Sequence, residues 1–105
     1  MLKPISMSCE AYFFTAPWCD PCHQAAPIFS EAARELNLPA SIIDVDLAPD
    51  LADRFGVESL PTIVVATHDQ RHGILVGSRP KAEVRAFLQS IIGEVSPSEP
   101  GAVAD

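Results

Sequence analysis

Basic residues are scarce in this 105-residue chain, which has 7 Lys and Arg against 14 Asp and Glu and a formal net charge of −7. Nucleic acids and anionic membranes are bound through clusters of Lys and Arg, so we expect neither as a partner. No apolar run approaches the ~18 residues of a membrane-spanning helix. The first ten residues, "MLKPISMSCE", hold one lysine and no apolar run typical of a signal peptide. We therefore expect a cytoplasmic protein.

Cysteine is also rare, and its number is odd, which excludes a framework that pairs every cysteine. Cys19 and Cys22 form one close pair and Cys9 stands apart, a pattern that fits a reducing compartment better than a secreted domain. No glycine-rich nucleotide fingerprint occurs, so we expect no bound cofactor. Apolar residues make up 48% of the chain, enough for one hydrophobic core. We expect a single domain over residues 1–93 and a disordered tail over residues 94–105, which is rich in Pro, Ser and small residues.

Hydrophobic patterning predicts an α/β fold with the order β-α-β-α-β-β-α. The sheet would have four strands in mixed orientation, with helices on its faces. The predicted strands cover residues 9–16, 41–47, 61–67 and 74–77, with a polar turn before the last one. The predicted helices run from Pro21 to Leu36, with Pro27 as an internal kink, over residues 49–55, and from Pro80 to Gly93.

The segment "APWCDPCHQAAP" places Cys19 and Cys22 directly after the first strand, at the start of the first helix. Asp20 stands at the expected N-cap and Pro21 at the first helical position. Unpaired N–H groups and the helix dipole favour a thiolate there. We interpret Cys19 as an exposed nucleophile and Cys22, one turn further, as the resolving cysteine of a dithiol that exchanges disulfides.

A structural zinc site is the alternative interpretation of this cysteine pair, but zinc needs four ligands. The remaining candidates, His68 and His72, fall in the polar turn, where two solvated histidines are the simpler explanation. We therefore expect no metal. Cys9 alternates with Ala11 and Phe13 on one strand face, which indicates a small buried or edge hydrophobe rather than a third redox thiol.

At these residues the chain resembles the thioredoxin family. "APWCDPC" is similar to the family's Trp-Cys-Gly-Pro-Cys, with Asp20 in place of glycine. Pro27 falls where the family has a helix proline, "FGVESLPT" is similar to the segment that ends in Ile-Pro-Thr, and "LVG" at 75–77 to the Val-Gly of the substrate groove. Over residues 9–92, the resemblance implies a thioredoxin-like fold and a thiol–disulfide oxidoreductase that reduces protein disulfides.

The resemblance also implies a substrate site and a redox partner. An apolar groove around the Cys19 sulfur would receive an extended segment of a disulfide-containing protein, paired with the backbone of Leu60. Pro61 would be in the cis form. A flavin- and NADPH-dependent thioredoxin reductase would re-reduce the protein, which we expect to be a monomer. The expected groove residues are Trp18, Pro21, Leu60, Pro61, Val76 and Gly77.

The chain departs from the family pattern beside both cysteines. The family's buried aspartate, held to help deprotonate the resolving cysteine, corresponds to Phe13, and its lysine partner to Ile42. Cys22 would then use water, Asp20, His23 or the substrate instead. Repulsion from the Asp20 carboxylate disfavours the Cys19 thiolate, unless helix capping offsets it, and predicts a reducing potential. The family also has a strand and a helix before the dithiol strand, where this chain has residues 1–8.

Two other functions remain open on the sequence alone. A glutaredoxin-like enzyme would use glutathione, although the motif differs from the Cys-Pro-Tyr-Cys of that family. A binding module would use the same fold to dock a partner, with a vestigial dithiol. Dependence of insulin reduction on Cys19 separates a reductase from a binding module.

Overall fold

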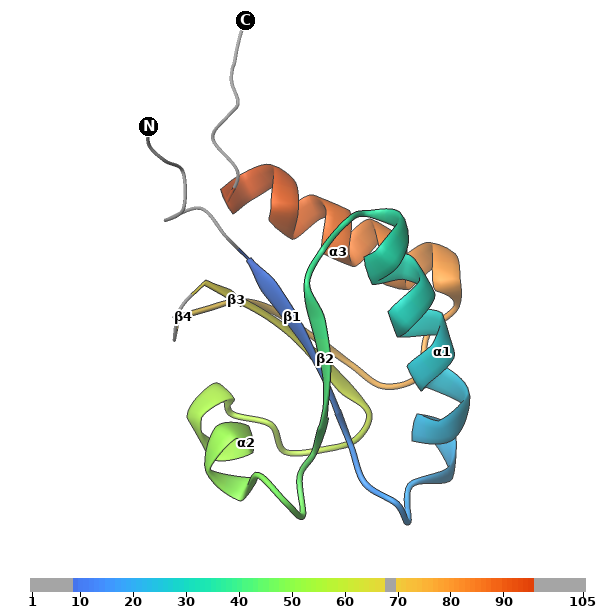
Figure 1. Ribbon diagram of the computed structural model, residues 1–105, viewed down its shortest axis with the longest axis vertical. Coiled ribbons are helices and arrows are strands. Elements are labelled where there is room, and N and C mark those ends of the chain that lie inside the picture. Colours follow the sequence, from blue (N-terminus) through green and yellow to red (C-terminus); the bar gives the residue numbers. More distant parts are fainter. Residues whose placement is uncertain (1–8, 68–69, 96–105) are drawn as a thin grey trace, which may run out of the picture.

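The computed structural model describes residues 9–67 and 70–95. Its order of elements is the predicted β-α-β-α-β-β-α (Figure 1). Within the described residues, no helix has the length and apolar character needed to cross a membrane. The elements are β1 (Glu10–Thr15), α1 (Asp20–Glu35), β2 (Ala40–Asp44), α2 (Pro49–Phe55), β3 (Thr62–Thr67), β4 (Gln70–Val76) and α3 (Lys81–Val95).

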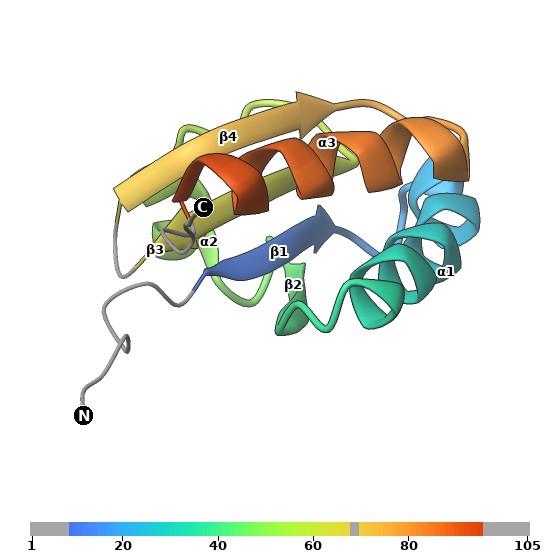
Figure 2. The same cartoon turned by 90° about the horizontal axis from the view of Figure 1, so that it is seen from above.

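The strands form one four-stranded mixed sheet in the order β2-β1-β3-β4. β1 runs parallel to β2 and antiparallel to β3, and β3 pairs antiparallel with β4. Helices α1 and α3 lie next to each other on one face of the sheet, and α2 covers the other face (Figures 1 and 2). The expected minimal four-stranded architecture is therefore confirmed.

Apolar side chains of β1 contribute to the core on both faces of the sheet, because successive strand residues point to opposite faces. Phe13 faces α1, where its ring lies 5.3 Å from that of Phe29 between centroids. Phe14 faces α2, where its ring meets Phe55 edge-on at 6.5 Å. Both β1 side chains are fully buried. The aromatic segment before the cysteine pair therefore anchors the sheet from both sides.

The start of α1 differs from the sequence-based expectation by one residue. Cys19 is the N-cap, with extended backbone angles, and Asp20 is already the first helical residue. No side chain caps this helix end. Pro21 thus takes the second helical position, where its missing N–H is still tolerated because first-turn N–H groups have no partner within the helix. The predicted N-cap role of Asp20 is wrong, and its carboxylate stays in the first turn of the helix.

Three other predicted boundaries are wrong. β2 ends at Asp44, whose carbonyl accepts hydrogen bonds from the N–H groups of Leu47 and Ala48 and so turns the chain. β4 begins at Gln70, because polar residues continue the hairpin pairing with β3. α3 continues past Gly93 to Val95. Glycine costs about 1 kcal/mol inside a helix, too little to end one whose apolar side packs on the core. Residues 96–105, most of the expected tail, lie outside the described residues.

Ion pairs join α1 to α3 on the surface. Lys81 Nζ lies 2.5 Å from Glu35 Oε2 and 3.4 Å from Glu31 Oε1, and Arg85 Nε lies 3.2 Å from Glu35 Oε1. The hydrogen bond from Lys81 lowers the pKa of Glu35 and, reciprocally, raises the pKa of Lys81. The stabilisation is present at neutral pH. It is lost as the pH falls through the lowered pKa of Glu35 or rises through the raised pKa of Lys81.

Candidate active site

Cys19 and Cys22 form a disulfide at the N-terminal end of α1. Their Cα atoms are 5.3 Å apart, the separation of residues one helical turn apart. Cys22 is fully buried and Cys19 is only 6% exposed, so the expected exposure of Cys19 is wrong in this oxidised state. The reason is that both cysteines belong to the core cluster between the sheet and α1. The bond is the oxidised form of the predicted dithiol.

The turn between β1 and α1 presents the cysteine pair. The Cys19 N–H donates to the Ala16 carbonyl at 3.1 Å and closes the turn directly after the strand. His23, one residue after Cys22, holds the same turn from the helix side, because its Nε2 lies 3.0 Å from the Pro17 carbonyl oxygen. This second contact gives His23 a structural role that the sequence did not reveal.

Trp18, one of the expected groove residues, precedes the disulfide directly and is 68% exposed. Its indole Nε1 donates a hydrogen bond of 3.2 Å to Asp46 Oδ2. Asp46 lies in the connection from β2 to α2 and looks in the sequence like one more solvated acidic residue. This hydrogen bond orients the exposed indole ring, which forms part of the lining of the pocket described below.

The loop before β3 contributes the expected cis peptide bond, between Leu60 and Pro61. The Pro61 carbonyl accepts a 2.8 Å hydrogen bond from the Gly77 N–H, so this loop and the end of β4 lie together. Gly77 has a φ of +95°, which a side chain would disfavour. Leu60 packs against the core cluster that holds both cysteines, and Val76 is exposed at the end of β4.

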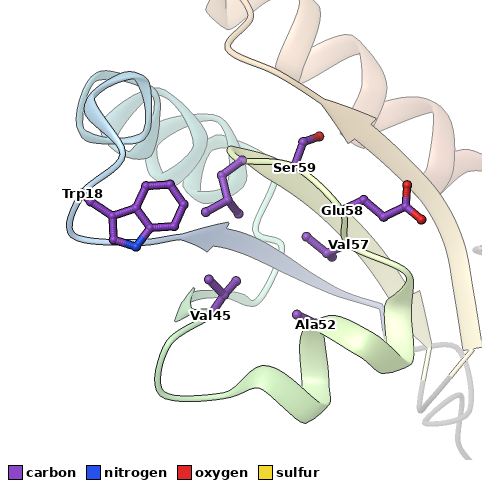
Figure 3. Close-up of a pocket in the computed structure, with 7 residues that line it drawn as sticks. Trp18, Val45, Ala52, Val57, Glu58 and Ser59 are labelled. Carbon is purple, nitrogen blue, oxygen red and sulfur yellow. The ribbon is translucent and has the colours of Figure 1, made fainter.

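An apolar pocket of about 390 Å³ has both Trp18 and Leu60 in its lining, and Figure 3 shows Trp18 at one side of it. These two expected groove residues therefore face one hollow. Sequence reasoning missed the other lining residues, which come from the chain just after β2, from α2 and from the loop before β3, and meet only in the folded chain. The "FGVESLPT" segment was a signal for three of them. The additional residues are Val45, Ala52, Val57, Glu58 and Ser59.

The environment of the cysteines holds no buried carboxylate at the position of Phe13, which packs against Phe29. Ile42, its neighbour on β2, is half exposed. Asp20 is exposed in the first turn of α1.

Within residues 9–67 and 70–95, no three His, Cys, Asp or Glu side chains gather as metal ligands do. His68 of the histidine pair considered above lies outside these ranges. Cys9 is buried, with its sulfur 4.0 Å from Thr67 Oγ1.

The amino-acid sequence is similar to those of known thioredoxins. The thioredoxin family model matches residues 12–90. Thioredoxin 1 of Synechococcus elongatus is 36% identical over 77 residues, which cover 71% of this chain and 72% of the relative. The chloroplastic M-type thioredoxin of Zea mays is 28% identical over 92 residues, covering 83% of this chain and 55% of the relative. The chain thus spans about half the length of the chloroplastic M-type relatives.

Solved structures show the same likeness. A point mutant of the thioredoxin from Halobacterium salinarum NRC-1 superposes with a TM-score of 0.71 at 26% identity, covering 90% of this chain and 81% of the other. Oxidised mitochondrial thioredoxin 3 from Saccharomyces cerevisiae gives a TM-score of 0.68 at 26% identity, with coverage of 81% and 82%. The Cys-x-x-Cys disulfide, the cis-proline loop and these matches together show that the chain belongs to the thioredoxin family.

Proposed function

We propose that this protein is a thiol–disulfide oxidoreductase that reduces protein disulfides, with Cys19 as the attacking and Cys22 as the resolving cysteine. The observation that carries the proposal is the Cys19–Cys22 disulfide at the start of α1, in a chain of the thioredoxin family. First-turn N–H groups and the helix dipole stabilise a Cys19 thiolate once the bond is reduced.

The reaction runs through one mixed disulfide. The Cys19 thiolate attacks a sulfur of the substrate disulfide, whose other sulfur leaves as a thiolate. Cys22 then loses its proton and attacks the Cys19 sulfur. The bond between Cys19 and the substrate breaks, the Cys19–Cys22 disulfide forms, and two electrons have passed to the substrate. Complete burial of Cys22 supports this division of roles, because an incoming protein cannot reach it first.

The substrate site in this proposal is the apolar surface around Cys19. Trp18 and Leu60 face the pocket of Figure 3, which can hold an apolar side chain next to the substrate disulfide. The Leu60 backbone would pair with an extended substrate segment. Hydrogen bonding between Pro61 and Gly77 supports a shared edge of the groove. The remaining groove residues in the proposal are Pro21 and Val76.

The proposal includes a reducing cellular partner. A flavin- and NADPH-dependent thioredoxin reductase would return the disulfide to the dithiol. The cytoplasm is the proposed compartment, supported by the odd number of cysteines. We further propose that the protein acts as a monomer without nucleic-acid or membrane partners, in keeping with its net charge of −7.

Turnover assays test the choice of reductant. We expect NADPH oxidation with insulin as substrate when this protein is combined with a thioredoxin reductase, because its pocket suits a protein segment. With glutathione and glutathione reductase in place of thioredoxin reductase, the rate should stay at the level without the protein. Turnover with glutathione alone would instead support the glutaredoxin-like alternative.

The charge of Asp20 is expected to make the protein a stronger reductant. Asp20 makes no capping bond, so its carboxylate repels a Cys19 thiolate and favours the disulfide. Asp20→Asn should shift the reduction potential to a less negative value, by about 30 mV for a tenfold change in the equilibrium constant. Equilibration with glutathione at pH 7 measures it. Asp50→Asn removes the same charge from the first turn of α2 and serves as the control. An unchanged or more negative potential in Asp20→Asn would contradict the expectation.

A further inference from the structure

The resolving cysteine faces a chemical difficulty in this chain. Cys22 must lose its thiol proton before it attacks the mixed disulfide, yet it is fully buried. Directly beneath the helix, β1 offers Phe13, which has no group that accepts a proton. A route for the proton must therefore start from another side of Cys22.

A second pocket, of about 380 Å³, lies on the β2 side of α1 and has Cys22 in its lining, although Cys22 itself is fully buried in this oxidised state. It is open to solvent and wide enough to hold water. Besides Cys22, two ionisable side chains line it, one from α1 and one from the end of β2. The lining residues are Thr15, Ala16, Pro17, Cys22, His23, Ala26, Ile42 and Asp44.

Of the two, Asp44 is the better placed to accept a proton. In the parallel register Asp44 lies beside Thr15, two positions beyond the pair of Phe13 and Ile42, so its side chain lies on the α1 face. The Asp46 N–H donates a 2.9 Å hydrogen bond to Asp44 Oδ1 and fixes the carboxylate. In the part of the chain that the structure describes, no hydrogen bond engages Oδ2. His23, by contrast, already uses its Nε2 at the Pro17 carbonyl.

We propose that the Asp44 carboxylate accepts the Cys22 proton, through water in this pocket, in the step that releases the reduced substrate. This inference rests on the proposed disulfide reductase function. The Cys22 S–H bond breaks and its proton passes to Asp44. The resulting thiolate forms a bond to the Cys19 sulfur, and the bond between Cys19 and the substrate sulfur breaks. The substrate leaves with both electrons as a thiolate, which takes a proton from solvent, and Asp44 returns its proton to solvent.

Other ionisable groups on the neighbouring elements bear on the pH dependence of this step. His23 of α1 is the other ionisable group in the lining. Asp20, in the first turn of α1, and Asp46, which accepts a hydrogen bond from Trp18, lie outside the lining. β1 contributes Thr15, which is not ionisable over the working range. Removing Asp44 leaves water or hydroxide as the acceptor, so the resolving step should then depend more steeply on pH.

Single-turnover kinetics with dithiobis(nitrobenzoate) test the inference, with reduced protein in excess. Attack by Cys19 releases one coloured thiolate, and resolution by Cys22 releases the second. In Asp44→Asn, which keeps an oxygen for the Asp46 N–H, we expect the first release to change less than about twofold. The second release should slow about tenfold at neutral pH, in the range of general acid–base effects, and recover as the pH rises. Asp44→Glu should retain most of the wild-type rate.

Asp50→Asn is the matched control, since it removes one carboxylate outside this pocket and should leave both releases unchanged. A normal second release in Asp44→Asn would overturn the inference while leaving the proposed function intact. Equal slowing of both releases, without recovery at higher pH, would overturn it in favour of a structural role. Absence of the first release in the wild-type protein would refute the proposed function itself. Should Asp44→Asn fail to fold, Asp44→Ser gives the same comparison, because its hydroxyl can also accept from Asp46.

Discussion

Cys19→Ser is expected to lower the rate of protein disulfide reduction by about a thousandfold or more, because loss of a nucleophile removes the covalent step on which the other groups act. A hydroxyl in this position is far less nucleophilic than a thiolate at neutral pH. The measurement is insulin reduction, followed by turbidity with dithiothreitol as electron donor. The disulfide at the start of α1 predicts this dependence, since no other described cysteine is placed to form the mixed disulfide.

Two matched variants sharpen the result. Cys22→Ser should trap the substrate as a stable mixed disulfide on Cys19, because no thiol remains to resolve it. Cys9→Ser should keep full activity, since Cys9 is buried beside Thr67 at the opposite end of β1 from the active site. Undiminished insulin reduction by Cys19→Ser would favour the binding-module alternative and contradict the proposed function.

Phe13→Asp is expected to have the largest effect on stability. The substitution introduces the family's carboxylate at its usual position, but here it removes a ring packed 5.3 Å from Phe29. Replacing a buried Phe by a small residue costs about 3–5 kcal/mol of unfolding free energy, and burying an unpaired carboxylate adds to this cost. Small domains have about 5–15 kcal/mol in total, so much of the protein should unfold. Urea denaturation followed by circular dichroism measures the loss.

The pH dependence of the unfolding free energy separates the effect of the introduced charge from the effect of the lost packing. Burial raises the pKa of an introduced carboxyl above its value of about 3.9 in the unfolded chain, so the folded state binds more protons. Phe13→Asp should therefore gain stability as the pH falls from 7 to 5. Phe13→Asn, which leaves a similar cavity without a charge, should lack this gain. A Phe13→Asp protein as stable as wild type at pH 7 would show that this site accommodates a carboxylate without a partner.

The features that could be predicted from the sequence are those that depend on short motifs and on patterns among neighbouring residues. The order of elements followed from alternation and helical spacing, since both patterns depend on neighbouring residues. The cis bond before Pro61 came with the family resemblance and is confirmed. The pairing of Cys19 with Cys22 followed from their spacing of one helical turn.

Features that depend on tertiary contacts could not be read in this way. The burial of Cys19 arises from packing of the disulfide into the core, which a helix-start argument does not include. Gly93 predicts a helix stop, but packing of the preceding turns outweighs its low helix propensity, and α3 continues to Val95. Asp46 and Val45 acquire their places at the active site because the chain turns toward α2 after Asp44. Their sequence neighbours give no indication of this.

The position of β2 has a consequence for behaviour at high concentration. Among the described strands it has one neighbour, so a row of backbone N–H and C=O groups faces outward along its free edge. Ala40, Ser41 and Ile42 are exposed on it, and such an edge is a template for strand addition by another chain. The strand is only five residues long and ends at a charged aspartate, two features that limit aggregation. Substitutions that lengthen this strand or remove its terminal charge would therefore risk self-association at a surface outside the pocket of Figure 3.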